Sequence, residues 1–242
     1  MRRKQETGVD YGIDGPGWVA GFTVATLALL LAACKMMLNG KRKWALRSLL
    51  AAIGTGGYVA NSIWTSRVGK LQVRDQILAW ADLQAHETVL DVGSGRGLLA
   101  IGCAMQTPQA WVVGLDRWRQ WDQWAISASN MLANAKQAGV QDKIAIISAD
   151  ARSIPCADAS FSCVVSSLVI HNLSRRADRR QAIREMYRVL QPGGRLVMFD
   201  IIHSREYPPL LKELGAEIKH VSTNGRLFFM PGRLIVAEKP KQ

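Results

Sequence analysis

VLDVGSGRG, residues 89–97, carries the strongest structural signal in this chain. A short apolar run leads into glycines at positions 93, 95 and 97, and the apolar segment LLAIG follows. Glycines let the backbone turn tightly and approach a ligand closely, and the N-terminus of a following helix offers free N–H groups to a carboxylate or phosphate. The pattern therefore predicts a strand, a ligand-binding loop and a helix.

On both sides of this loop, apolar strands alternate with amphipathic helices, which is typical of a parallel α/β sheet. We predict strands near residues 88–93, 111–116, 144–149, 163–170, 195–200, 217–222 and 233–238. Helices are predicted near 97–107, 121–138 and 175–190, the last ending at QPGG because Pro192 and the glycines cannot continue a helix. The basic run SRRADRR, residues 174–180, is predicted to be a solvated face or a contact for lipid head groups or an acidic substrate.

Acidic residues follow the predicted strands, at the sheet edge where ligands of such folds bind. Asp116 ends the second strand, nineteen residues after Gly97, where a carboxylate can accept both hydroxyls of a ribose. Asp150 ends the third strand, placed to meet an adenine amino group, and Ala151 would supply a backbone N–H. A solvated turn for Asp116 and a helix cap for Asp150 are the alternatives.

Four ordered segments together resemble the class I S-adenosylmethionine-dependent methyltransferases: VLDVGSGRG, VVGLDRW, ISADARSIPCADASFSCVVSSLVIHNL and EMYRVLQPGGRLVMFD. The resemblance covers residues 75–240 and is strongest to the small-molecule branch that includes the quinone-ring methyltransferases. It implies a Rossmann-like α/β fold, with a seven-stranded sheet, an antiparallel final strand and helices on both faces. It also implies S-adenosylmethionine as the cofactor.

The resemblance also implies a cofactor site. Asp91 and the glycine loop would hold the methionine part of the cofactor, Asp116 the ribose and Asp150 the adenine. Trp118 would pack on the adenine face or, alternatively, in the core. The full predicted cofactor-binding set is Asp91, Gly93, Ser94, Gly95, Gly97, Asp116, Arg117, Trp118, Asp150, Ala151 and Ser166. The four cysteines lack the spacing of a zinc site, so no metal is predicted.

His171 and Asn172 are the predicted catalytic residues. Methyl transfer from a sulfonium is an in-line displacement in which proximity and alignment do most of the work, and a base is needed only if the acceptor loses a proton. His171 could be that base, or a histidine that orients a loop, and Asn172 could orient substrate or cap a helix. Residues 166–172 lack the Asn-Pro-Pro-aromatic box of N-methylating nucleic-acid enzymes, so no nucleic-acid substrate is predicted.

WVAGFTVATLALLLAAC, residues 18–34, contains no charged residue. Extended to Leu38, it would form a helix of about 32 Å, enough to cross a bilayer. A second, weaker stretch covers residues 48–66, so one span or a helical hairpin is predicted, and we favour the hairpin. A cleaved export signal and a buried core helix are the alternatives. The preceding segment DYGIDGPGW, residues 10–18, could fold over the active site if the N-terminus is cytosolic.

The predicted organisation is a tail over 1–17, a membrane anchor over 18–66 and a methyltransferase domain over 67–242. Residues 1–75 hold eleven Lys and Arg against four Asp and Glu, in a chain of net charge +12, which favours anionic lipid over nucleic acid as a partner. We predict a membrane-anchored methyltransferase acting on a small lipophilic acceptor, with its catalytic domain facing the cytoplasm. The alternatives are a nicotinamide-dependent oxidoreductase, disfavoured by Leu98 at the third glycine position, and a non-catalytic cofactor-sensing membrane module. The sequence does not set the oligomeric state.

Overall fold

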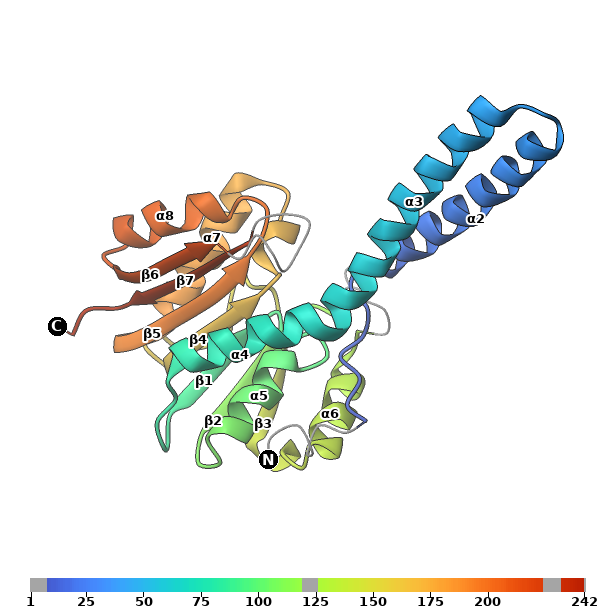
Figure 1. The fold of residues 1–242 in the computed structure, drawn as a ribbon. Helices are drawn as coiled ribbons and strands as arrows, with labels where there is room; N and C mark the ends of the chain where they lie inside the picture. The colour runs from blue at the N-terminus through green and yellow to red at the C-terminus, as the bar shows by residue number, and fades with distance from the viewer. Residues whose placement is uncertain (1–7, 119–125, 224–231, 242) are drawn as a thin grey trace.

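The computed structural model describes residues 8–118, 126–223 and 232–241. A seven-stranded sheet forms its centre, in the order β3-β2-β1-β4-β5-β7-β6 (Figure 1). The strands are β1 (Thr88–Val92), β2 (Trp111–Asp116), β3 (Ile144–Ser148), β4 (Phe161–Ser167), β5 (Leu190–Asp200), β6 (Glu217–Thr223) and β7 (Arg233–Glu238). Strands β1 to β5 run parallel, and β7 is antiparallel to both of its neighbours, which confirms the predicted sheet.

Helices cover both faces of the sheet, as predicted. They are α4 (Lys70–Ala81), α5 (Leu98–Gln106), α6 (Ala128–Gln137), α7 (Arg176–Arg188) and α8 (Tyr207–Glu213). One apolar cluster packs α4, α5 and α6 on the first face, with Ile77 and Met131 fully buried, and a second packs α7 and α8 on the other, with Ile183 and Leu211 fully buried. Helices α4 and α8 were not predicted. The predicted helix start at 121–125 lies outside the described residues.

Two predicted details, at β4 and at the start of β5, are wrong. Strand β4 stops at Ser167 because Leu168 takes a φ of +58°, so the predicted strand over 163–170 is too long. Strand β5 begins at Leu190, which pairs with Phe161, so QPGG lies inside a strand and does not end a helix. The pairing register of β4 and β5 shifts here, and Gly193 takes a φ of +77°. The basic run SRRADRR is exposed or half-exposed, as predicted for a solvated face, except for Arg179, which is buried and donates to backbone carbonyls.

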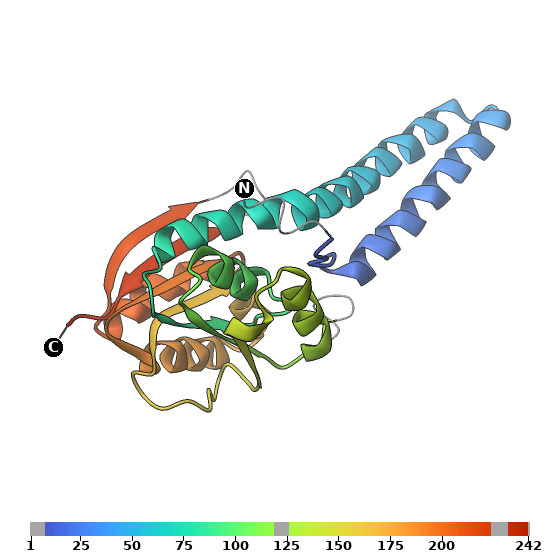
Figure 2. The same cartoon turned by 90° about the horizontal axis from the view of Figure 1, so that it is seen from below.

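The N-terminal part of the chain forms a helical hairpin, α2 (Pro16–Leu38) and α3 (Arg42–Trp64), that projects from the domain (Figures 1 and 2). The two helices pack along their length, and the Thr26 hydroxyl donates to Thr55 Oγ1 across them at 2.7 Å. Within α2 only Ala33 is buried. Of the described helices, α2 alone is long and apolar enough to cross a membrane by length and composition.

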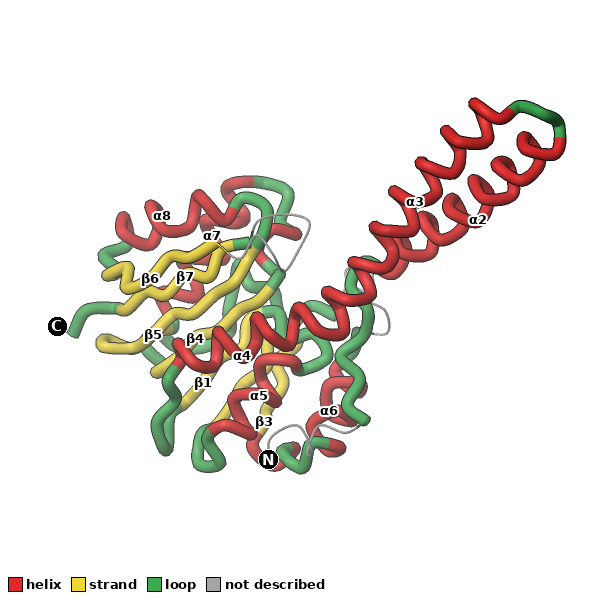
Figure 3. The backbone as a smooth tube through the Cα atoms, viewed as in Figure 1, coloured by secondary structure: helices red, strands yellow, loops and turns green. Residues whose placement is uncertain are grey.

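Helix α3 continues without a break into the domain. A π-helical turn, η1 (Thr65–Gly69), joins α3 to α4, so one helical rod leads from the hairpin to the face of the sheet (Figure 3). Such π-helical turns are rare and are found frequently at functional sites. Here Thr65 and Ser66 are both buried where the hairpin meets the domain.

Candidate functional site

The glycine loop after β1 is built on backbone conformations that other residues rarely adopt. Gly93 and Gly97 have φ values of +76° and +89°. A Cβ atom at Gly93 would also overlap the side chain of Val169, from the segment after β4. The N–H groups of Gly93 and Ser94 donate to Leu115 O at 2.7 and 3.1 Å, which fixes the loop against the end of β2.

Asp91 lies beneath this loop and is almost completely buried. Its Oδ2 accepts a hydrogen bond from the backbone N–H of Ala100 in α5, at 2.9 Å. The pKa of Asp91 is raised to about 8, mainly because the carboxyl is buried, and the nearby charge of Asp116 contributes in the same direction. The Asp91 carboxyl is therefore protonated at neutral pH.

The raised pKa of Asp91 predicts a pH-dependent stability. The folded state holds the proton up to about pH 8, whereas an unfolded aspartate ionises near ~3.9, so unfolding becomes easier as the pH rises between these values. Asp91→Asn removes the titrating group. Between pH 5 and pH 8 the wild type is therefore expected to lose free energy of unfolding that the variant keeps, so the variant becomes more stable relative to wild type as the pH rises. Urea unfolding at several pH values measures the difference. Asp142→Asn, at an exposed site, is the control, and a pH-independent difference for Asp91→Asn would contradict the prediction.

Asp116 ends β2 and connects the glycine loop to the next segment. Its Oδ2 accepts from Gly95 N–H at 2.8 Å and its Oδ1 from Trp118 N–H at 2.7 Å. Both carboxylate oxygens keep a further lone pair for a ligand hydroxyl. Trp118 itself takes a φ of +55°, donates from its indole Nε1 to Ser148 Oγ at 2.7 Å and packs on the core.

Asp150, at the end of β3, is held by two guanidinium groups. Arg152 donates to it at 2.7 Å and Arg117 pairs with it at 2.9 Å. The hydrogen bonds from Arg152 hold the pKa of Asp150 below its usual range, so it stays ionised. An adenine amino group that donated to the Asp150 carboxylate would bind it alongside Arg117 and Arg152.

These residues line one cavity of about 930 Å³, at the upper end of the size of small-molecule sites. The predicted site residues that line it are Asp91, Gly93, Ser94, Gly95, Asp116, Arg117, Asp150, Ala151, His171 and Asn172. Three others do not: Gly97 caps α5, Trp118 packs on the core, and Ser166 donates to Val92 O at 2.9 Å.

The lining fits S-adenosylmethionine, a cation that also carries a carboxylate and a ribose. Ser94 Oγ is buried and has no hydrogen-bond partner among the described residues. Leu98 and Leu99 line the cavity from the first turn of α5, where backbone N–H groups have no partner within the helix. The same cavity thus presents carboxyl groups to the cationic parts of S-adenosylmethionine and hydrogen-bond donors to its carboxylate.

His171 reaches the cavity from the segment after β4 and is held by Asp200, at the end of β5. The ring Nδ1 lies 2.5 Å from Asp200 Oδ1, and the His171 backbone N–H donates to Asp200 Oδ2 at 3.0 Å. Tyr207 Oη also donates to this buried carboxylate, at 3.2 Å. No described residue pairs with the other ring nitrogen, Nε2. Asp200 was not among the predicted site residues, although it ends the segment EMYRVLQPGGRLVMFD.

The segment before α2 lies against the same site. Lys70 Nζ, buried at the start of α4, donates to Tyr11 O at 2.8 Å and Gly12 O at 2.7 Å. Burial lowers the pKa of Lys70. Asp10 pairs with Arg96 of the glycine loop at 3.0 Å. Tyr11 and Asp14 line the cavity, so the N-terminal segment forms part of its wall.

Comparison with known proteins shows that the α/β domain is similar to methyltransferases. Residues 90–198 match the family model of the methyltransferase domain. The chain is 36% identical over 133 residues to a demethylmenaquinone methyltransferase of Deinococcus radiodurans, covering 54% of this chain and 48% of that protein. It is 31% identical over 130 residues to a ubiquinone/menaquinone biosynthesis C-methyltransferase of Dinoroseobacter shibae, covering 52% and 47%. The chain thus spans about half the length of the curated relatives it matches.

Solved structures share the fold at lower identity. A methyltransferase from Aquifex aeolicus matches with a TM-score of 0.55 and 18% identity, over 68% of this chain and 88% of that one. The [4+2]-cyclase SpnF matches with a TM-score of 0.62 and 18% identity, over 71% and 82%, so the fold alone does not determine the reaction. Residues 90–198 thus match a methyltransferase domain, and the sheet order and the glycine loop around this match agree with the class I methyltransferase fold, which takes S-adenosylmethionine as its cofactor.

Proposed function

We propose that this chain transfers a methyl group from S-adenosylmethionine to a small, lipophilic, quinone-like acceptor at a membrane. The observation that carries the proposal is the single cavity that joins Asp91 and Asp116, on the cofactor side, to His171 and to the base of the helical hairpin. The names of the two relatives, both methyltransferases of quinone biosynthesis, support a quinone-like ring as the acceptor.

S-adenosylmethionine supplies an electrophilic methyl group when it is bound. The residues of this chain then have two tasks: to align the acceptor and to remove its proton where the acceptor atom carries one. Asp200 holds His171 Nδ1 and thereby presents Nε2 to the cavity as the proton acceptor. Asn172, which is exposed and lines the cavity, would orient the acceptor.

The hairpin supports membrane anchoring. Large apolar side chains are more than half exposed along both helices, namely Val24, Leu27, Leu31, Leu46, Leu50 and Ile53, which is unusual for a surface in water. The 23 residues of α2 extend for about 34 Å, close to the ~30 Å of a hydrocarbon core.

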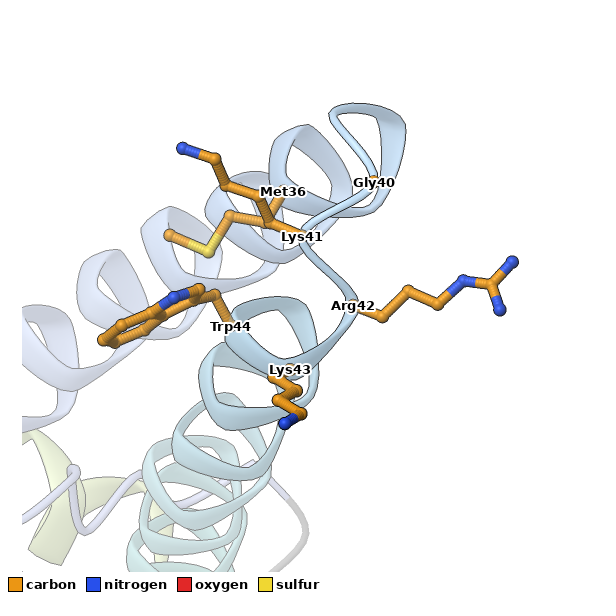
Figure 4. Close-up of a pocket in the computed structure, with 6 residues that line it drawn as sticks. All are labelled: Met36, Gly40, Lys41, Arg42, Lys43 and Trp44. Atoms are coloured by element: carbon orange, nitrogen blue, oxygen red, sulfur yellow. The ribbon is translucent and has the colours of Figure 1, made fainter.

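The far end of the hairpin has the chemistry of a membrane interface. Lys41 lies in the turn between α2 and α3, and Arg42 and Lys43 begin α3. With Met36, Gly40 and Trp44 they line an open cavity of about 610 Å³ (Figure 4). Cationic and tryptophan side chains in this arrangement suit the head-group region. With the catalytic domain on the cytoplasmic side, where S-adenosylmethionine is made, this turn would lie at the opposite leaflet.

Calorimetry on the full chain tests the cofactor step of this proposal. S-adenosylmethionine and S-adenosylhomocysteine are expected to bind, and Asp116→Asn is expected to weaken both at least tenfold, because a carboxylate hydrogen bond contributes about 1.5–3 kcal/mol. Asp142→Asn, on the exposed turn before β3, is the control and should bind as the wild type does. The absence of binding to either compound would refute the proposed function.

A further inference from the structure

The cavity extends well beyond the residues that face the cofactor. Trp18 and Phe22 line it from α2, and Tyr58, Asn61 and Ser62 line it from α3. Both helices of the hairpin therefore contribute to the wall of the same space that His171 enters. A hairpin that served only as an anchor would not need to share residues with the active-site cavity.

The chemistry of the lining changes along the cavity. Nearest the domain, the π-helical turn presents Thr65 and Ser66, and one turn earlier α3 presents Asn61 and Ser62, all of which can form hydrogen bonds. Further along the hairpin the lining becomes aromatic, and together these residues suit a molecule with a polar head and an apolar tail.

Three aromatic rings form the outer part of the lining. Phe22 and Tyr58 face each other across the two helices with ring centroids 4.4 Å apart, and Trp18 lies 6.4 Å from Phe22. Trp18 is 70% exposed, so this group reaches from the cavity to the outer surface of the hairpin. Beyond it, α2 and α3 present apolar side chains to their surroundings.

Specific buried contacts fix the hairpin in this position. The Asp14 backbone N–H donates to Ser66 Oγ at 3.0 Å, and Lys70 holds the backbone of residues 11 and 12. These bonds join the segment before α2 to η1 and to the start of α4, at the edge of the cavity. The two helices are therefore positioned relative to the catalytic domain by its own residues.

We infer that the hairpin forms the acceptor site, and that the acceptor is a membrane amphiphile whose polar, hydroxyl- or carbonyl-bearing ring lies at Asn61, Ser62 and Thr65, next to His171. Its apolar tail leaves the cavity past Trp18, Phe22 and Tyr58 and continues along the hairpin into the bilayer. This inference rests on the proposed function, because it names the class of acceptor for the same reaction.

The test uses the full chain in vesicles made from a total lipid extract of its source cells, supplied with S-adenosylmethionine labelled in the methyl group. Label is counted separately in the organic and aqueous phases. The double variant Phe22→Ala/Tyr58→Ala removes both facing rings and is expected to lower transfer to the organic phase at least tenfold. Leu31→Ala, at a 72% exposed position further along α2, is the matched control and should leave transfer unchanged.

Two further measurements separate a lost acceptor site from a misfolded protein. S-adenosylhomocysteine affinity, by calorimetry, should stay within twofold of wild type in every variant. Tyr58→Phe, which keeps the ring, should transfer more label to the organic phase than the double variant does. Wild-type transfer by the double variant, or label that enters only water-soluble products, would overturn the inference while leaving the methyltransferase function intact. Label in neither phase would overturn the proposed function as well.

Discussion

His171→Ala is expected to lower the kcat of methyl transfer by about 10²–10⁴-fold, the range in which a positioned general base contributes. The affinity for S-adenosylmethionine should change less than twofold, because His171 enters the cavity from the segment after β4 and not from the glycine loop. Single-turnover transfer from labelled cofactor measures the rate, and calorimetry measures the affinity. A rate within threefold of wild type would show that His171 is not the base.

Asp200→Asn tests whether the carboxylate positions this histidine. Asp200 accepts from His171 Nδ1 and N, Ile201 N and Tyr207 Oη, and an amide cannot accept from all of them. The variant is expected to be slower and less stable. The acid limb of its pH–rate profile should move to lower pH, because a neutral amide stabilises an imidazolium less than a carboxylate does.

The control for this experiment is Tyr207→Phe, which removes one donor from Asp200 without touching His171. Its free energy of unfolding is expected to fall by about 1 kcal/mol, the contribution of a typical hydrogen bond, while its pH profile stays that of wild type. If Asp200→Asn lost stability with an unchanged pH profile, the carboxylate would have a structural role only.

The pairing of His171 with Asp200 illustrates what the sequence could not predict. Both residues stand in segments that indicate the fold, but they are 29 positions apart. They meet because β4 and β5 are parallel neighbours with Ser167 beside Phe199, which aligns the two strand ends. Strand order is a long-range property that no local pattern encodes, whereas the glycine loop and its flanking strand are local and could be predicted.

Lys70 gives a second example. In the sequence Lys70 is one of many basic residues near the hairpin, and the basic excess of residues 1–75 predicted a contact with anionic lipid. In the structure its ammonium group is buried against carbonyls that lie 58 and 59 residues earlier in the chain. The apolar run of α2 could be predicted from composition alone, but the docking of the hairpin on the cavity depends on this pairing between distant segments.

Gly93→Ala is expected to have the largest effect on the fold of the site. A φ of +76° costs an alanine about 1–2 kcal/mol, and the added Cβ overlaps the Val169 side chain, where overpacking costs about 1–3 kcal/mol more. Val169 precedes the turn that carries His171, so the displaced side chain disturbs both halves of the cavity. We expect a loss of about 2–5 kcal/mol in the free energy of unfolding and at least tenfold weaker binding of S-adenosylmethionine.

Gly139→Ala separates the cost of the backbone conformation from the cost of the overlap. Gly139 has a φ of +70°, and among the described residues no atom lies near the position of an added Cβ. It should lose only the backbone term, about 1–2 kcal/mol, and bind S-adenosylmethionine normally. The double variant Gly93→Ala/Val169→Ala removes the overlap but keeps the strained φ, so it should recover part of the stability lost by Gly93→Ala. If Gly93→Ala were no less stable than Gly139→Ala, the contact with Val169 would not be what requires glycine at this position, and the loop would owe its glycine to φ alone.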